Sequence, residues 1–178
     1  MASEQTPQIK VALTKAGAAD VPALAELAAI IWPEAFGDMI TQAQIDYMLE
    51  HIQSAPAMTE QMSQGMHYWF IHCDDVRSGY AAVRHDTDTA TSHLSKFYLL
   101  PAVRGGTVAS AALDHINAIA RDRGSRTLAL TVNKYNARAI RFYDKRGFKT
   151  TQEVVMDIGG GFVMDDFCME LDLGGPQI

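Results

Sequence analysis

Residues 94–148 decide the fold, and they read LSKFYLLPAVRGGTVASAALDHINAIARDRGSRTLALTVNKYNARAIRFYDKRGF. The segment starts as an apolar strand, which Pro101 ends. A glycine-containing turn and an amphipathic helix follow, and Gly124 suits the position just after that helix. A short apolar strand then leads into a second helix, which begins at Asn136 and ends at Gly147. This order predicts two parallel strands joined by a right-handed helical crossover.

Strand and helix patterns continue on both sides of this segment. Alternating or apolar runs predict strands over residues 9–13, 67–73, 79–85, 93–100, 127–132, 148–158 and 162–173. A first helix is expected from its N-cap Asp20 to Trp32, because Pro33 disfavours continuation. Thr41 suits the cap of a second helix, and residues 54–65 are expected to form a loop with irregular helix.

The order of these elements predicts the fold class and the domain organisation. We expect one α/β domain over residues 8–173, with a mixed, mostly antiparallel sheet of about seven strands and helices on both faces. Residues 1–7 and 174–178 are expected to be flexible tails. A chain of 178 residues buries enough surface to fold without a disulfide or a metal.

The composition argues against several classes of protein. The net charge of −6 disfavours non-specific nucleic-acid binding and mildly favours cationic partners such as amines. No apolar run approaches the length of a membrane span, and the polar N-terminus lacks the apolar core of a signal peptide. Cys73 and Cys168 lie in apolar stretches without metal-ligand spacing and are expected to be buried thiols. We therefore expect a cytoplasmic protein that binds no metal.

The turn VRGGTVAS, residues 103–110, has the composition of an anion site. Its glycines allow the backbone to approach a ligand without a Cβ in the way. The helix that follows directs its free N–H groups and the positive end of its dipole into the turn, which suits a pyrophosphate. A plain strand-to-helix turn would have the same local composition, so the neighbouring motifs decide between the two interpretations.

These motifs resemble those of one enzyme superfamily. The run NARAIRFYDKRGF, residues 136–148, resembles the N-x-x-A-x-x-F-Y-x-x-x-G-F signature of the GNAT acetyltransferases. The turn resembles the family's [QR]-x-x-G-x-[GA] pyrophosphate loop, with Arg104 first and Ala109 last, and FYLLP over residues 97–101 resembles its acetyl-CoA-binding strand. Thr107 departs from the pattern, because the family usually has glycine there. Its hydroxyl could donate to a phosphate, or its Cβ could obstruct the cofactor.

The resemblance implies a GNAT fold that binds acetyl-CoA as co-substrate between two splayed parallel strands, here residues 93–100 and 127–132. The residues that it assigns to cofactor binding are Phe97, Tyr98, Leu99, Arg104, Gly105, Gly106, Thr107, Val108, Ala109, Asn136 and Tyr143. A backbone N–H near Leu99 would face the thioester oxygen, where negative charge develops during the reaction.

Two of these residues carry more specific expectations. Tyr143 matches the family's tyrosine whose hydroxyl lies near the coenzyme sulfur, so it is the candidate general acid for the leaving thiolate. A core aromatic beside Phe142 would explain the same residue type. Asn136 is expected to cap its helix and to contact the coenzyme arm, and the capping role alone would also explain it.

Two further residues are candidates for the general base that takes the proton of the amine. His93 lies six residues before Leu99, where some family members place a catalytic carboxylate, and strand alternation puts both on one face. Glu34 follows the first expected helix and would lie near the acceptor. A surface or packed histidine at a strand start, and a solvated loop carboxylate, would explain the same two residues. Water is the third carrier of the proton, since many members of the family use no dedicated base.

The acceptor side is less strongly marked in the sequence. Residues that could shape its wall are Trp32, Phe36, Tyr47 and Met48. Aromatic residues and methionines at helical spacing also build ordinary cores, so both interpretations stay open. The pair Asp165-Asp166 either attracts a cationic substrate or lies in a turn or at a sheet edge.

Together these features predict an N-acetyltransferase. It would move the acetyl group of acetyl-CoA to a primary amine of a small molecule, such as a polyamine or an amino acid, by direct attack in a ternary complex. An acyl-CoA sensor without turnover, or acetylation of a protein N-terminus or lysine, are the alternatives. A P-loop protein is disfavoured because the turn lacks Gly-Lys-Ser/Thr. A homodimer stays open, since dimers are common among small enzymes.

Overall fold

The computed structural model of the protein describes residues 9–175. Its strands are β1 (Val11–Ala16), β2 (Met66–Cys73), β3 (Val76–Asp86), β4 (Thr91–Leu99), β5 (Thr127–Asn133), β6 (Lys149–Gly159) and β7 (Phe162–Asp172). Its helices are α1 (Val21–Phe36), α2 (Gln42–His51), α3 (Ala55–Ser63), α4 (Thr107–Asp122) and α5 (Ala137–Lys145), with short 3-10 turns at Ala18–Asp20 and Pro101–Val103. The boundary expected at residue 8, the tail expected over 1–7 and the last three residues of the tail expected over 174–178 lie outside the described residues.

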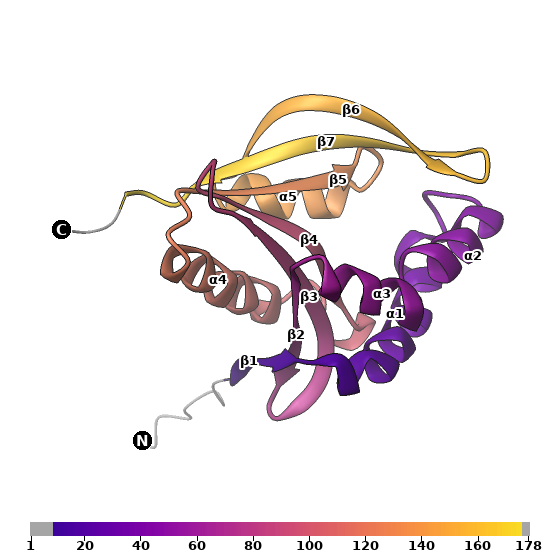
Figure 1. Ribbon diagram of the computed structural model, residues 1–178, viewed down its shortest axis with the longest axis horizontal. Coiled ribbons are helices and arrows are strands. Elements are labelled where there is room, and N and C mark those ends of the chain that lie inside the picture. Colours follow the sequence, from indigo (N-terminus) through magenta and orange to yellow (C-terminus); the bar gives the residue numbers. More distant parts are fainter. Residues whose placement is uncertain (1–8, 176–178) are drawn as a thin grey trace, which may run out of the picture.

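The seven strands form one mixed sheet in the order β1-β2-β3-β4-β5-β7-β6 (Figure 1). The pair β4 and β5 is parallel, and the other neighbouring pairs are antiparallel. Helix α4 is the crossover that joins the parallel pair. The predicted α/β class and the mixed, mostly antiparallel sheet are therefore confirmed.

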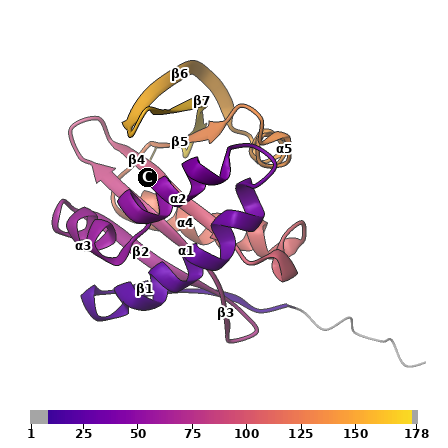
Figure 2. The same cartoon turned by 90° about the vertical axis from the view of Figure 1, so that its right-hand side faces the viewer.

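Helices cover both faces of the sheet, and each face has its own core. On one face, Leu113 and Ile116 of α4 and Tyr143 of α5 pack against the central strands. On the other face, the core includes Leu24 of α1 and Tyr80 of β3. Figure 2 shows α1, α2 and α3 in front of the sheet, with α4 behind it. Among the described residues, no helix is long and apolar enough to cross a membrane.

Helices α2 and α5 start at the capping residues of the sequence, whereas the predicted cap Asp20 makes no side-chain hydrogen bond to α1. The Thr41 hydroxyl accepts a hydrogen bond from the backbone N–H of Gln44 at 3.2 Å, so α2 begins where predicted. The Asn136 side chain likewise accepts from the N–H of Ala139 at 3.1 Å and caps α5. Gly124 has a φ of +80°, which confirms its place just after α4.

Two helix predictions were wrong. Helix α1 continues past Pro33 to Phe36, and the Gly37 N–H still donates to the Pro33 carbonyl at 3.1 Å. The rings of Trp32 and Phe36 stack with centroids 4.3 Å apart, so packing holds the last turn although proline removes one backbone hydrogen bond. Residues 54–65 were expected to form a loop with irregular helix, but residues 55–63 form the regular helix α3, because the Ser54 hydroxyl caps its start.

The parallel strands β4 and β5 diverge after a short paired region. Their register covers residues 91–93 of β4 and 127–129 of β5. Beyond that point β4 stays paired with β3 as far as Leu99, and β5 stays paired with β7 as far as Asn133. A wedge-shaped gap therefore opens inside the sheet, as the family resemblance implies.

A β-bulge in β4 lies where the gap begins. Ala82 of β3 is opposite Lys96, whereas its neighbour Val83 is opposite Leu94, so Ser95 is the extra residue. A bulge bends its strand and increases the local twist, which helps to turn β4 away from β5. It also reverses the side-chain alternation, so His93 lies on the face opposite to Leu99. The prediction that both share one face was wrong for this reason.

The β6–β7 hairpin closes over the end of α2. The turn falls at Gly159–Gly161, as predicted, and all three glycines have positive φ. The Tyr47 hydroxyl of α2 donates to the Ile158 carbonyl at 2.7 Å, and the Gln44 side chain donates to the Val163 carbonyl at 2.9 Å. Figure 1 shows the hairpin reaching over the rest of the sheet to α2.

Candidate active site

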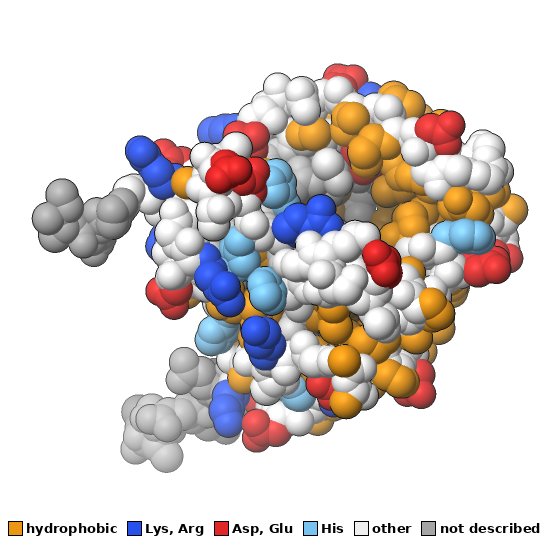
Figure 3. Space-filling view, viewed as in Figure 1, with side chains coloured by type: hydrophobic (Ala, Val, Ile, Leu, Met, Phe, Trp, Pro, Cys, Tyr) orange, Lys and Arg blue, Asp and Glu red, His pale blue; other side chains and the backbone are white. Residues whose placement is uncertain are grey.

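A cavity of about 440 Å³ occupies the gap between β4 and β5. Four parts of the chain line it: the end of α1, the second half of β4 with the turn that follows it, the end of β5 with α5, and the middle of β7. Figure 3 shows hydrophobic side chains gathered around the hollow beneath the β6–β7 hairpin. The cavity therefore runs through the sheet and connects its two faces.

Nine of the residues predicted to bind the cofactor lie together in this lining. They are Phe97, Tyr98, Leu99, Arg104, Gly105, Gly106, Ala109, Asn136 and Tyr143. Thr107 is exposed and lies outside the lining, so its side chain does not fill the cavity. Val108 is 3% exposed and packs in the core under α4, which leaves only its backbone available to a ligand.

The backbone of β4 presents free polar groups to the gap. The Leu100 N–H donates to the Ser78 carbonyl at 2.8 Å, so this pair is hydrogen-bonded across β3 and β4. In an antiparallel ladder such pairs alternate with non-bonded ones. The pair Gly79 and Leu99 is therefore non-bonded, and the N–H of Leu99 points away from β3 into the gap. The same alternation points the N–H and C=O of Phe97 into the gap.

The turn before α4 forms an open cradle at one end of the cavity. Gly105 has a φ of +74°, and a Cβ placed on Gly105 or Gly106 would meet no atom within 4 Å. Helix α4 begins at Thr107, so its first N–H groups have no partner within the helix and point into this space. The geometry is that of an anion site at a helix N-terminus.

Arg104 holds this turn in place. Its Nε donates to the Leu99 carbonyl at 2.8 Å, and its Nη1 forms an ion pair with the Glu34 carboxylate of α1. The side chain is 12% exposed, and its Nη2 is buried with no hydrogen-bond partner among residues 9–175. Arg104 thus joins the end of β4, the turn and α1, and it keeps one donor free beside the cavity.

Tyr143 and Asn136 bring α5 to the opposite side of the gap. Tyr143 is 8% exposed and packs against Phe142 and Phe148, so the core role and the cavity role coexist in one residue. Burial raises the pKa of its hydroxyl above the usual range, so the hydroxyl is protonated at neutral pH. The Asn136 oxygen caps α5, which leaves its amide group as a donor toward the cavity.

Three cations on α5 line the cavity and were not singled out from the sequence. Arg138, Arg141 and Lys145 are exposed and are spaced by three and four residues. This spacing places them on one side of the helix, which is the signal that would have found them. Together with the cradle before α4, they make this end of the cavity suitable for phosphate groups.

The other end of the cavity has an aromatic wall. Trp32 and Phe36 of α1 each pack against the Tyr98 ring, with centroids 5.5 and 6.1 Å apart. These three residues line the cavity, as does Asp166 of β7. Met48 is 3% exposed and belongs to the core, whereas Tyr47 contacts the hairpin, so neither of these residues lines the cavity.

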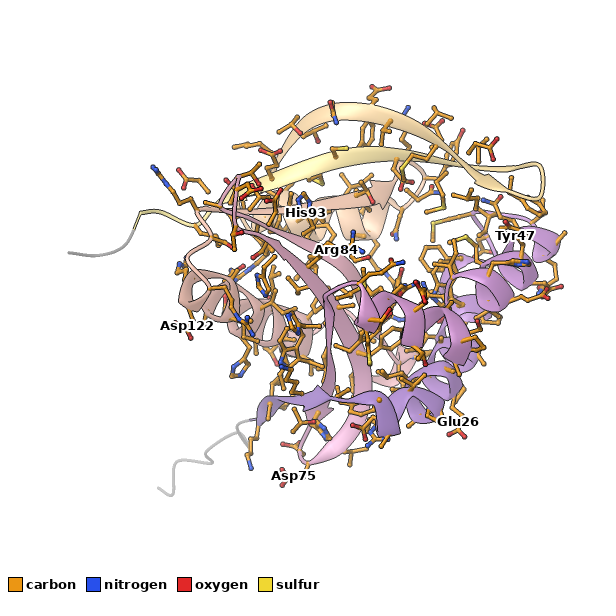
Figure 4. The ribbon with its side chains drawn as sticks, viewed as in Figure 1. Glu26, Tyr47, Asp75, Arg84, His93 and Asp122 are labelled. Carbon is orange, nitrogen blue, oxygen red and sulfur yellow. The ribbon has the colours of Figure 1, made fainter. Side chains whose placement is uncertain are left out.

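The two candidate bases lie away from the cavity lining. His93 is exposed at the paired end of β4, opposite Ala129, and Figure 4 shows it near the start of that strand. Six residues of strand separate it from Leu99 by roughly 20 Å. Glu34 belongs to α1 and pairs with Arg104. The base role of either residue stays a prediction.

The turn or edge placement weighed for Asp165-Asp166 was wrong. Both residues lie within β7, which is flanked by β5 and β6. Asp166 is opposite Asn133 of β5 and Val154 of β6, and it is 1% exposed. Its place inside the sheet follows from the strand order β5-β7-β6, which brings the last strand of the chain between two earlier ones.

Comparison with known proteins agrees with this geometry. A profile of the acetyltransferase (GNAT) family matches residues 24–148. An N-acetyltransferase of Mycobacterium tuberculosis, named as uncharacterized, is 44% identical over 71 residues, which are 40% of this chain and 45% of the relative. The chain thus covers less than half the length of that relative.

Solved structures resemble the whole described fold. The PaiA N-acetyltransferase of Thermoplasma acidophilum, in complex with coenzyme A, aligns with a TM-score of 0.73 at 20% identity. The alignment covers 92% of this chain and 99% of the PaiA chain. A GCN5-related N-acetyltransferase from Rhodopseudomonas palustris has a TM-score of 0.75 at 18% identity, with 90% and 94% covered.

The divergent parallel pair and the helix-start cradle define an α/β protein with the fold of these N-acetyltransferases. The family profile covers more than half of the chain. The protein belongs to the acetyltransferase (GNAT) family.

Proposed function

We propose that the protein transfers the acetyl group of acetyl-CoA to the primary amine of a small molecule. The observation that carries this proposal is a single cavity with two features of the family's chemistry. At one end are the anion cradle of Gly105 and Gly106 and the start of α4. Along its side runs the unpaired backbone of β4.

The described residues fit acetyl-CoA. The N–H groups at the start of α4 and the cations Arg138 and Arg141 would hold its phosphates. The N–H and C=O of Phe97, which point into the gap, would hold the amides of its extended arm, because they lack a strand partner there. Bound in this way, acetyl-CoA supplies an activated acetyl thioester.

The chain's own groups then suit acyl transfer. The N–H of Leu99 points into the gap and would stabilise the negative charge that develops on the thioester oxygen. Tyr143 stays protonated, so its hydroxyl can donate to the sulfur that leaves. The aromatic wall of Trp32, Phe36 and Tyr98 excludes water from the amine side and holds the acceptor near the thioester.

A small acceptor is favoured by the contacts around the amine side. The hairpin is fixed to α2 by the Tyr47 hydroxyl and the Gln44 side chain, so β7 and the end of α1 enclose this part of the cavity. A long peptide would need a groove that runs across the surface, whereas a small amine needs only an enclosed pocket.

The test combines a binding and a turnover measurement. Isothermal titration with acetyl-CoA is expected to show saturable binding, and release of free thiol is expected to depend on an added small amine. Mass spectrometry of the acceptor should then show one added acetyl group. Binding without thiol release across polyamines, amino acids and peptides would instead indicate an acyl-CoA sensor. Thiol release with peptides alone would indicate a protein acetyltransferase.

A further inference from the structure

Asp166 has a buried carboxylate oxygen that stays without a partner in the described fold. It is 1% exposed, and its Oδ1 has no hydrogen-bond partner between residues 9 and 175. It lines the cavity together with Thr131 of β5 and Tyr98 of β4. A buried polar atom without a partner costs stability, so its place at a ligand cavity indicates that a ligand completes its hydrogen bonding.

Within residues 9–175, Asp166 forms no ion pair. Its neighbour Asp165 pairs with Lys134, whose Nζ is 2.6 Å from Asp165 and 2.8 Å from Glu153. Lys134 is thus committed to two other carboxylates. Val154, the residue opposite Asp166 on β6, is uncharged. A cation from the ligand would therefore be the direct counter-charge of Asp166.

The titration of Asp166 agrees with a role in proton transfer. The pKa of Asp166 is raised above the usual range, mainly because the carboxyl is buried. The nearby charge of Asp165 also raises this pKa, whereas a hydrogen bond from the Thr131 side chain and the charge of Lys134 lower it. Other titratable groups of the same surroundings are Tyr98 of β4 and Cys168 of β7. A carboxylate with a pKa closer to neutrality is a more effective general base at neutral pH.

A second hollow adjoins the main cavity, which Asp166 lines. Its volume is about 490 Å³, and it shares Ile40 and Asn133 with the main cavity. The exposed carboxylate of Asp38 lies on its wall, as does Asp165. The hollow opens near the α1–α2 connection, whereas the phosphate cradle lies at the start of α4. The exposed carboxylate of Asp38 favours the approach of a cation from this side.

We propose that Asp166 binds the ammonium group of the acceptor and takes one of its protons before the amine attacks. This inference rests on the proposed acetyl transfer. The ammonium gives one proton to the Asp166 carboxylate, and the free amine then forms a C–N bond to the acetyl carbon while the C–S bond breaks. The second proton of the nitrogen passes to the thiolate through the Tyr143 hydroxyl. Asp166 returns its proton to solvent, so each turnover yields one amide, one thiol and one proton.

The test compares Asp166→Asn with Glu170→Gln, which removes a carboxylate from an exposed position on the same face of β7. Thiol release is measured with an alkylamine and with an O-alkylhydroxylamine, which is already uncharged at neutral pH. We expect Asp166→Asn to lower kcat/KM for the alkylamine by about 10²-fold or more and to affect the O-alkylhydroxylamine far less. Its acetyl-CoA affinity and the activity of Glu170→Gln should match the wild type.

The outcomes separate the two proposals. The role of Asp166 alone would be overturned if the wild type is active and Asp166→Asn keeps its activity with both substrates. An equal loss of activity with both substrates would overturn it as well. A wild type that releases no thiol with any amine would overturn acetyl transfer as well. If the variant fails to fold, inhibition of the wild type by a tertiary ammonium and by its uncharged carbon isostere decides. The cation should bind at least about tenfold more tightly, and equal inhibition would contradict the proposal.

Discussion

The substitution Ala109→Glu should separate folding from acetyl-CoA binding. Ala109 is the third residue of α4 and lines the cavity beside the glycine cradle. A glutamate at this helix position is favourable for the helix, because its negative charge faces the positive end of the dipole and it can reach the N–H of the N-cap residue Gly106. The variant should therefore fold with nearly the stability of the wild type.

The same charge opposes the phosphates of the coenzyme. A carboxylate about 5 Å from one phosphate charge costs about 3 kcal/mol at an effective dielectric constant of about 20, which is about a hundredfold in affinity. Ala109→Gln has the same bulk without the charge and is the matched control. The loss for glutamate relative to glutamine should shrink as the salt concentration rises.

Isothermal titration of both variants with acetyl-CoA at low and high salt measures this difference. Thermal unfolding without ligand checks that both are folded. Equal affinities of the glutamine and glutamate variants would show that no phosphate binds at the start of α4, and the assignment of the cradle would then be wrong.

Three further predictions concern the acid, a cap and pH. Tyr143→Phe should lower kcat by about 10²-fold while the acetyl-CoA affinity stays within about twofold, because the hydroxyl acts on the leaving group; an unchanged kcat would remove Tyr143 from the mechanism. Asn136→Ala should lower the free energy of unfolding by about 1 kcal/mol and Tm by about 2–4 °C. Asn136→Ser keeps a capping oxygen and should lose less stability. Equal losses of stability in the two variants would mean that the capping hydrogen bond of α5 contributes nothing. Burial, Arg123 and His67 lower the pKa of His85 from 6.5 to about 4, so the folded state favours its neutral form. The stability that neutral His85 contributes is fully present above pH 6.5 and is lost as the pH falls toward 4, because the unfolded chain then binds a proton that the folded protein does not. Tm should therefore decline over that range, and it should decline less in His85→Asn. Identical pH dependence of Tm in the two proteins would contradict the assignment.

The motifs of residues 94–148 made the fold and the proposed coenzyme side of the cavity predictable. The order of strands and helices, the caps at Thr41 and Asn136 and the glycine turn depend on neighbouring residues, which the sequence displays directly. The cations of α5 were equally visible, since the spacing of Arg138, Arg141 and Lys145 is helical.

Other features depend on contacts between distant parts of the chain. The continuation of α1 past Pro33 depends on the packing of Trp32 and Phe36, which outweighs a local preference. The bulge at Ser95 depends on the register between β3 and β4, and no residue type marks it. Asp166 becomes a buried cavity residue only because β7 inserts between β5 and β6.

Hydrogen–deuterium exchange with and without acetyl-CoA tests most directly whether the β4–β5 gap is the coenzyme site. Saturating acetyl-CoA should slow exchange in peptides that cover residues 94–99 and 105–109, because their backbone N–H groups would gain partners. Peptides from β1 and β2, which lie away from the gap, should exchange as before. Unchanged exchange over 94–99 and 105–109 at ligand concentrations that saturate binding would contradict the proposed site.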